Sequence, residues 1–339
     1  MSACASKALP AAPCPSAQLT TGSVVRNGTQ RRRRLWQGAF FVLFAVAPWF
    51  DLFRYDLTTG HAWILTFPWR LGLDEFIAGR LSAGQAALQV VLRLFLPLLA
   101  LAGVVLSVAW RWGRLYCGWL CPHFSVVETL NELMLRACGR VSLWDKPVEG
   151  VGGAPLHGHD ARWWLVLLLL TISFAFVWAV VLLSYLLPPA TVYGHLWHGT
   201  LRRPEALFVG VATTVLSLEF LFGRHLFCRY ACAVGMFQSL AWIANPRAMV
   251  VGFSRQRASA CADCLPARAF ACEAACPMRL RPRALKRHMF ACTQCGKCLE
   301  ACQTVQLQRP PGTLLKWVDG STARAGEAGF SSSARPNRH

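Results

Sequence analysis

Eight cysteines lie within 42 residues near the C-terminal end of this chain, in two runs of four. The second run has the spacing C-x2-C-x2-C-x3-C, in which three thiolates hold one [4Fe–4S] cluster and the fourth reaches a second cluster. The first run keeps an opening C-x2-C and a closing C-x3-C-P but has seven residues between them, which lengthens a loop and removes no ligand. The pattern predicts single-electron chemistry at two clusters.

The cross-over of the fourth ligand assigns four thiolates to each cluster. One set is Cys261, Cys264, Cys272 and Cys302, and the other is Cys276, Cys292, Cys295 and Cys298. Zinc ribbons and disulfides are the alternatives. Zinc sites, however, favour C-x2-4-C pairs separated by a longer spacer, and disulfides need an oxidising compartment. We therefore predict two [4Fe–4S] clusters bound by these eight cysteines.

The rest of the chain has the composition of a membrane protein. Of its 339 residues, 55% are hydrophobic and 15% are charged, which is more apolar than a typical soluble domain. Stretches long enough to cross a bilayer occur at Leu35–Phe53, Ala86–Trp110, Trp163–Leu187 and about Leu207–Phe222. The basic run before the first stretch also fits a signal peptide, but no small-residue cleavage site follows. We predict about four transmembrane helices, the first one retained.

The distribution of Lys and Arg predicts the orientation of these helices. With both termini on one side, the segments 1–34, 111–162 and 223–339 hold 6, 6 and 17 of the 35 basic residues, and the two opposite loops hold 5. Because short loops rich in Lys and Arg stay in the cytoplasm, we predict that both termini and the cysteine-rich segment are cytoplasmic. The net charge of +19 then reflects topology in a lipid bilayer, and we expect no nucleic-acid partner.

A second cysteine pattern occurs twice. A Gly-Arg dipeptide and an aromatic residue precede the pair Cys117 and Cys121 after the second predicted span, and the same order precedes Cys228 and Cys232 after the fourth. A C-x3-C pair on a helix places both sulfurs on one face. We predict two pseudo-repeated hairpins whose four thiols form one redox or metal site at the cytoplasmic interface. Copper, a further iron–sulfur centre and a dithiol relay remain open, as does simple packing of small side chains.

Together these motifs resemble the membrane-bound polyferredoxins that accompany periplasmic nitrate reductase, nitrous oxide reductase and the copper-dependent cbb-type oxidase. The resemblance covers about residues 35–318, in the Cys117–Pro122 motif, the Cys228–Cys232 motif and the Cys261–Cys302 block. The chain departs from the family pattern at Ala233 and Gln303, where prolines are expected. The resemblance implies a multi-pass protein of the bacterial cytoplasmic (inner) membrane with redox partner proteins, and it leaves quinone open as a further partner.

The predicted fold class is an α-helical membrane protein with a C-terminal α+β, two-cluster ferredoxin-like domain. We expect a disordered tail at 1–34, a four-span membrane domain at 35–250, the ferredoxin-like domain at 251–318 and a second tail at 319–339. Ionisable residues at membrane depth or beside the cysteine pairs are further candidates for proton or quinol chemistry: Arg93, Glu128, Glu219 and His225.

Two functions follow from these expectations. Glycine-rich nucleotide motifs are absent from the sequence, which argues against nucleotide-driven hydride or phosphoryl transfer. In the first function, the chain passes electrons between the quinone pool or a cytoplasmic donor and a partner respiratory oxidoreductase, for example as a quinol dehydrogenase subunit. In the second, it reduces a metal ion such as copper during assembly of a terminal oxidase. The layout of the chain favours the first.

Overall fold

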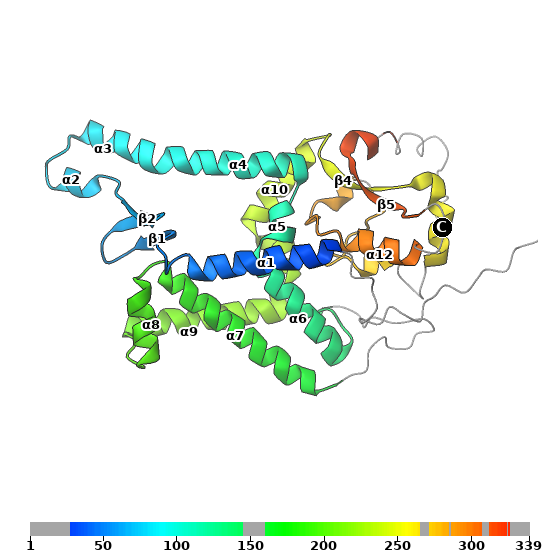
Figure 1. The fold of residues 1–339 in the computed structure, drawn as a ribbon, viewed down its shortest axis with the longest axis horizontal. Helices are drawn as coiled ribbons and strands as arrows, with labels where there is room; N and C mark the ends of the chain where they lie inside the picture. The colour runs from blue at the N-terminus through cyan, green and yellow to red at the C-terminus, as the bar shows by residue number, and fades with distance from the viewer. Residues whose placement is uncertain are drawn as a thin grey trace, which may run out of the picture.

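The computed structural model describes residues 28–144, 160–264, 271–284, 286–306, 312–323 and 325. Its long helices run roughly along one direction, with a small sheet at one end and the cysteine-rich domain at the other (Figure 1). Three helical runs are long and apolar enough to cross a membrane: Ala83–Trp112, Arg162–Ser184 and Arg203–Gly223. They correspond to the second, third and fourth predicted spans.

The first of these runs contains a proline that shapes it. The run consists of α3 (Ala83–Val90), the π-helical η2 (Val91–Phe95) and α4 (Leu96–Trp112). Pro97 has no amide hydrogen to donate to the carbonyl four residues earlier, and that carbonyl, of Arg93, accepts the indole N–H of Trp69 instead at 2.8 Å. The Arg93 guanidinium donates to the carbonyl of Arg70 at 2.9 Å, so its contacts are with the loop at this end of the helix.

The helix at the first predicted span is displaced toward the N-terminus. It is α1 (Gly28–Val46), and the chain turns at residues 47–50 instead of continuing to Phe53. Pro48 explains why the helix ends at Val46, because a proline disfavours helical geometry at the residue before it. Residues Gly28–Arg34, expected in the N-terminal tail, belong to this helix. Four of the residues of α1 are arginines, which leaves its apolar part short. Helix α1 is not among the three membrane-length runs.

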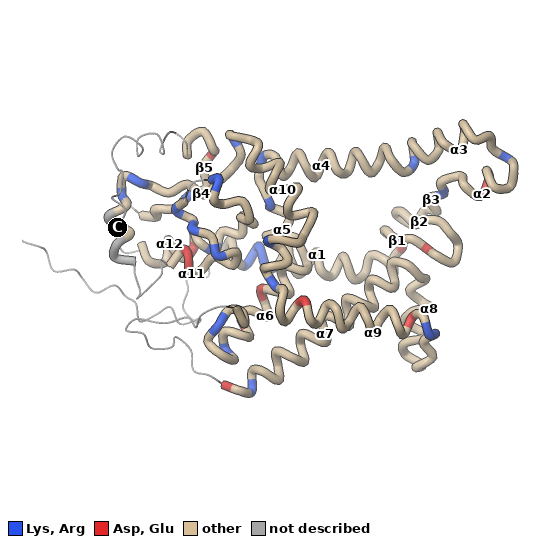
Figure 2. The backbone as a smooth tube through the Cα atoms, turned by 180° about the vertical axis from the view of Figure 1, so that it is seen from behind, with Lys and Arg blue, Asp and Glu red and all other residues tan. Residues whose placement is uncertain are grey.

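The two connections expected to face away from the cysteines lie together at one end of the molecule (Figure 1). The first contains the antiparallel strands β1 (Phe53–Asp56), β2 (His61–Ile64) and β3 (Phe67–Trp69), followed by α2 (Leu73–Ile77). The second contains α8 (Pro189–Trp197). Lys and Arg gather at the opposite end, around the cysteine-rich domain (Figure 2).

The two halves of the membrane region interlock. The first half continues from α4 into α5 (Leu115–Trp119) and α6 (Pro122–Cys138). The second runs through α7 (Arg162–Ser184), α9 (Arg203–Leu218), the π-helical η4 (Glu219–Gly223) and η5 (Phe227–Ala231), and α10 (Ala233–Ala244). The helix after each cysteine pair packs against the other half, α6 on α7 and α10 on α4. This crossed packing places the two cysteine pairs near each other.

Helix α6 shows how the sequence sets this arrangement locally. Pro122 occupies its first position and Gly139, with a φ of 67°, ends it, which are the favoured places for these two residues. Between them, apolar residues at helical spacing form one buried face: Val126, Val127, Leu130, Leu133 and Met134. That face meets Leu167 and Ala175 of α7 and Phe220 of η4, and their burial holds the two halves together.

The C-terminal domain has the mixed α and β character that the sequence predicted. Its strands β4 (Met249–Phe253) and β5 (Leu315–Asp319) pair antiparallel, and its helical segments are η6 (Arg255–Cys264), α11 (Ala271–Ala274), η7 (Lys286–Met289) and α12 (Lys297–Gln306). Asp319, expected in the C-terminal tail, is the last residue of β5. Residues 320–323 and 325, also expected in that tail, are helical. The remaining parts of the predicted tails, 1–27, 324 and 326–339, lie outside the described residues.

Candidate iron–sulfur centres

One set of four cysteines lines a single apolar pocket in the C-terminal domain. The four are Cys276, Cys292, Cys295 and Cys298, and they come from both runs. Pro277, Met289 and Trp317 are among the apolar residues that complete the wall. Four thiols around one dry pocket fit the ligand set of a [4Fe–4S] cluster.

The other set lies in a neighbouring buried core. Cys261, Cys272 and Cys302 pack there with Leu314 and Leu315. Burial raises the pKa of Cys272 to about 12, and the charges of Cys261 and Cys302 add to this effect. The side chain of Cys264 lies outside the described part of the structure. The three described members therefore lie together in one core.

The loop through the second cysteine run curls around its sulfurs. Gln294 and Gly296 have positive φ values of 57° and 74°, a conformation that glycine adopts freely and that costs other residues free energy. The backbone N–H of Gln294 faces the sulfur of Cys292, and in the first run the backbone N–H of Leu280 donates to Cys276 Sγ at 3.4 Å. Burial outweighs these contacts and raises the pKa of Cys292 to about 12. Metal binding must therefore displace a proton from such thiols.

The four cysteines of the membrane region also converge. Burial, followed by the charge of Cys121, raises the pKa of Cys117 to about 12, with a further contribution from Cys232. Burial and the charges of Cys121, Cys117 and Cys232 raise the pKa of Cys228 well above its usual range. All four thiols are thus close enough to act on one another. Cys121 precedes the first residue of α6, where backbone N–H groups of His123 and Phe124 face its sulfur.

The surroundings of Arg114 bear on whether this group of thiols suits an anionic cluster. Its side chain is buried, with Nε donating to the carbonyl of Gly235 at 2.6 Å and Nη1 to that of Cys228 at 3.0 Å. Its Nη2 is buried and has no hydrogen-bond partner in the structure. Burial lowers the pKa of Arg114, whereas Cys117, Cys232, Cys228 and Cys292 raise it. A buried cation with an unused donor among thiols fits an iron–sulfur cluster, which carries negative charge on its sulfurs.

The membrane cysteines touch the C-terminal domain directly. The indole of Trp119 donates to the carbonyl of Gln294 at 3.0 Å. Gly118 approaches the same loop so closely that a Cβ atom would lie 2.1 Å from the carbonyl oxygen of Thr293. Cys121, Cys228, Cys276 and Cys292 all pack against one apolar core that includes Phe124 and Trp242. The two cysteine loops are therefore in contact across the domain boundary.

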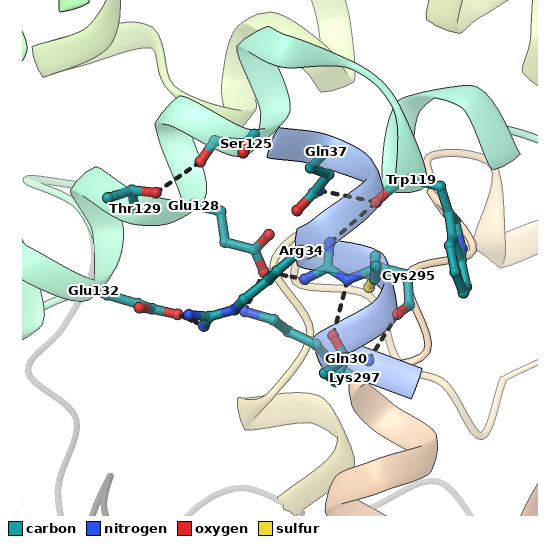
Figure 3. Close-up of polar contacts among 12 residues, drawn as sticks. Gln30, Arg34, Gln37, Trp119, Ser125, Glu128, Thr129, Glu132, Cys295 and Lys297 are labelled. Carbon is teal, nitrogen blue, oxygen red and sulfur yellow. Dashed lines mark hydrogen bonds and ion pairs between the residues drawn. The ribbon is translucent and has the colours of Figure 1, made fainter. Parts of the chain in front are cut away.

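A row of polar side chains on helix α1 stabilises the contact between the two cysteine loops (Figure 3). Gln30 donates to the carbonyl of Cys295 at 3.0 Å. Arg33 and Gln37 each donate to the carbonyl of Gly118 at 3.0 Å. The three positions lie on one face of α1 because they are three and four residues apart. The arginine run that the sequence marked as a topology signal therefore has a second, structural role.

Glu128 joins three elements at this row. Its carboxylate accepts a 2.6 Å contact from Arg33 and pairs with Lys297 of α12. Burial would raise the pKa of Glu128, but Lys297 and Arg33 outweigh it and hold the pKa at about 2. The sequence indicated Glu128 as a candidate for proton or quinol chemistry, whereas the structure makes it the centre of a buried ion-pair network between α1, α6 and α12.

Two other ionisable candidates have different surroundings. Burial lowers the pKa of His225 to about 3, and both of its ring nitrogens are buried without a hydrogen-bond partner in the structure. Glu219 contacts His123 Nε2 at 2.8 Å, and His123 Nδ1 lies 3.3 Å from Cys228 Sγ. His123 was not among the residues predicted from the sequence, although its place two residues after Cys121 was a signal.

Among the described residues, no group of three His, Cys, Asp or Glu side chains has the geometry to hold a single metal ion. A cubane cluster makes a different demand, because each of its four thiolates binds a different iron atom. The cysteine groups of this protein are candidates for a cluster site of that second kind.

Comparison with known proteins points to the same chemistry. Residues 94–140 and 205–247 match the model of a family described as a 4Fe-4S binding domain. Each segment contains one C-x3-C pair, which supports the predicted internal repeat, and neither includes the Cys261–Cys302 block. The findings support iron–sulfur clusters in this protein and do not distinguish among the polyferredoxin types that the sequence resembles.

One relative is a protein of Escherichia coli (strain K12) named "Putative electron transport protein YccM". It is 27% identical over 243 residues, which cover 70% of this chain and 60% of the relative. The chain therefore spans less than two thirds of that relative's length. No solved structure matches the chain.

Proposed function

We propose that this chain is a membrane-bound iron–sulfur electron carrier with three centres. Two [4Fe–4S] clusters are held by the cross-over sets of the C-terminal domain, and a third centre is held by Cys117, Cys121, Cys228 and Cys232. An iron–sulfur cluster supplies one-electron redox chemistry when bound. The observation that carries the proposal is the direct contact between the membrane cysteine loop and the loop of Cys292–Cys298.

The protein's own residues support this role in three ways. Apolar walls around Cys276 and its partners exclude water, which stabilises clusters against loss. Arg114 places positive charge between the membrane thiols and Cys292, where it favours negatively charged ligands. The row Gln30, Arg33 and Gln37 fixes the distance between the two cysteine loops.

The electron route follows from this order of sites. We propose that electrons pass between a cytoplasmic donor or the quinone pool and a partner respiratory oxidoreductase, in the cytoplasmic membrane of a bacterium, with the C-terminal domain in the cytoplasm. The name of the Escherichia coli relative and the basic end of the molecule support this proposal. The alternative role, metal-ion reduction for oxidase assembly, has no observation of its own in its favour.

Metal content tests the number of centres. Anaerobically purified protein should contain about twelve irons and twelve acid-labile sulfides per chain, four of each per cluster. The variant with Cys117, Cys121, Cys228 and Cys232 all changed to Ser should contain about eight. A content of about eight in both proteins would overturn the third centre, and stoichiometric zinc without visible absorption would overturn all three.

Anaerobic reduction tests the route. A quinol analogue and a low-potential cytoplasmic-type donor, such as reduced flavodoxin, should be offered separately while the visible spectrum is followed. Bleaching of the wild-type spectrum by either donor supports the proposed electron carrier. In the quadruple serine variant, bleaching by the quinol analogue should be lost. Failure of both donors to reduce any centre would contradict it.

A further inference from the structure

The four membrane thiols are not equivalent, because one of them has a histidine neighbour. His123 Nδ1 lies 3.3 Å from Cys228 Sγ, and His123 Nε2 lies 2.8 Å from Glu219 Oε2. His123 comes from the first half of the repeat, and Glu219 and Cys228 come from the second. The positions equivalent by the repeat are Val234 and Ala109, so neither polar residue recurs in the other half. Cys117, the equivalent of Cys228, lies 3.3 Å from Gln238 Oε1 instead.

The surroundings of this pair are aromatic. The His123 ring lies 5.2 Å from that of Phe227, 5.4 Å from that of Phe220 and 6.5 Å from that of Trp178, measured between ring centroids. The side chains of His123 and Glu219 are 15% and 18% exposed, and Glu219 Oε1 is buried without a hydrogen-bond partner in the structure. A hydrogen bond is stronger in such an environment than in water. A hydrogen bond between His123 and the Cys228 sulfur is therefore stronger here than it would be in water.

The chemistry of the partners fixes the direction of the sulfur contact. A cysteine that ligates iron is a thiolate and has no proton to donate, whereas an imidazole nitrogen can donate. The proton of this contact therefore belongs to His123 Nδ1. The contact between Glu219 Oε2 and His123 Nε2 is compatible with this assignment in two protonation states: an imidazolium ring beside a carboxylate, or a neutral ring with its proton on Nδ1 that accepts from a protonated carboxyl group at Nε2.

We propose that His123 donates a hydrogen bond to the Cys228 sulfur and thereby raises the reduction potential of the membrane centre. Glu219 is a positioning residue that holds the imidazole ring. The proposal rests on the proposed function, because it assumes that Cys228 is a cluster ligand. Hydrogen bonds to cluster sulfurs stabilise the reduced, more negative form and are a known determinant of cluster potential. The asymmetry would favour electron residence at the membrane centre.

Two substitutions separate the hydrogen bond from packing. His123→Phe keeps an aromatic ring in an aromatic environment and removes the donor. His123→Asn loses the ring but retains an N–H donor near the position of Nδ1. Potentials should be measured by redox titration of the full-length protein with electron paramagnetic resonance detection. The clusters of the C-terminal domain serve as internal controls in every sample.

In His123→Phe, the equilibrium constant for one-electron reduction of the membrane centre should fall about tenfold, equivalent to about 59 mV. His123→Asn should give a smaller fall. An unchanged potential in His123→Phe, or equal falls in both variants, would overturn the proposal. A wild-type protein without a third cluster would instead overturn the proposed function, and this inference with it.

A measurement on the wild type guards against variants that lose the centre. Electron–nuclear double resonance on reduced protein labelled with 15N-histidine should show a histidine nitrogen coupled to the membrane cluster. The matched sample carries Glu219→Ala, in which the coupling should weaken because the ring is no longer held. A membrane cluster without any histidine coupling in the wild type would contradict the hydrogen bond.

Discussion

The indole nitrogen of Trp119 donates a hydrogen bond of 3.0 Å to the carbonyl oxygen of Gln294. Trp119 lies between Cys117 and Cys121, and Gln294 lies between Cys292 and Cys295. This bond therefore joins a cysteine loop of the membrane region to a cysteine loop of the C-terminal domain. The two regions are packed as one unit, and the contact surface between them is where substitutions should be most informative.

The close approach at Gly118 predicts an overpacking effect. In Gly118→Ala the new Cβ atom would lie 2.1 Å from the Thr293 oxygen, so one loop must move. Overpacking of this kind costs about 1–3 kcal/mol. Thermal unfolding in detergent, followed by tryptophan fluorescence, should show a lower transition temperature. The control is Gly38→Ala in α1, where no atom lies within 4 Å of the new Cβ and alanine favours the helix. Equal effects of the two changes would contradict the tight contact.

The buried network around Glu128 predicts a larger loss. Glu128→Gln leaves Arg33 and Lys297 without their counter-charge in a buried site, and breaking a buried ion pair in this way costs about 3–5 kcal/mol. Glu132→Gln is the matched control, because its pair with Arg34 is exposed and such pairs contribute about 0–1 kcal/mol. The transition temperatures of the two variants should differ clearly, with Glu132→Gln close to the wild type.

The same carboxylate predicts a pH dependence. The pKa of Glu128 is about 2 in the folded protein, below its ordinary value of 4.5. A lowered pKa stabilises the folded state above the unfolded value and loses that contribution as the pH falls toward the folded value. The difference in transition temperature between the wild type and Glu128→Gln should stay constant from pH 7 to about 5 and shrink below about 4.5. A difference that grows on acidification would contradict this assignment.

The cross-over grouping predicts which cysteine variants resemble each other. Cys302→Ser should impair the same cluster as Cys261→Ser, although Cys302 belongs to the second run, because these residues lie in one core. Cys276→Ser should in turn resemble Cys292→Ser, since both side chains line one pocket. The electron paramagnetic resonance signals of the reduced variants distinguish the two groups. Pairing by run instead of by space would show that each cluster uses its own run.

Membrane topology is checked by reporter fusions. The loops that lie at the end opposite the cysteine-rich domain (Figure 1) should be periplasmic, and we expect fusions at Thr59 and near Pro204 to report that side. Fusions after Pro147 or Gly312 should report the cytoplasm. A cytoplasmic result at Thr59 would mean that α1, whose apolar part is short, does not cross the bilayer.

The cysteine spacing and the apolar stretches by themselves indicate the cofactor class and the membrane character of this protein. The predicted cross-over of Cys276 and Cys302 rests on local spacing, because the ferredoxin pattern sends the fourth cysteine of each run to the other cluster. Three of the membrane helices follow from runs of apolar residues that exceed the bilayer thickness. The repeated C-x3-C pairs also indicated one shared site, because equivalent segments take equivalent places in a pseudo-symmetric fold.

Only the tertiary structure decided which polar side chains meet. Arg33 counted in the sequence as one positive charge among four neighbours, yet it is fully buried against Glu128, 95 residues away. His123 and Glu219 are separated by 96 residues, and no local pattern links them. Such pairs depend on how α6 crosses α7 and η4, and that crossing is set by the summed packing of many apolar side chains. Local spacing therefore predicts the cysteine ligand sets, whereas long-range packing decided which polar groups lie around them.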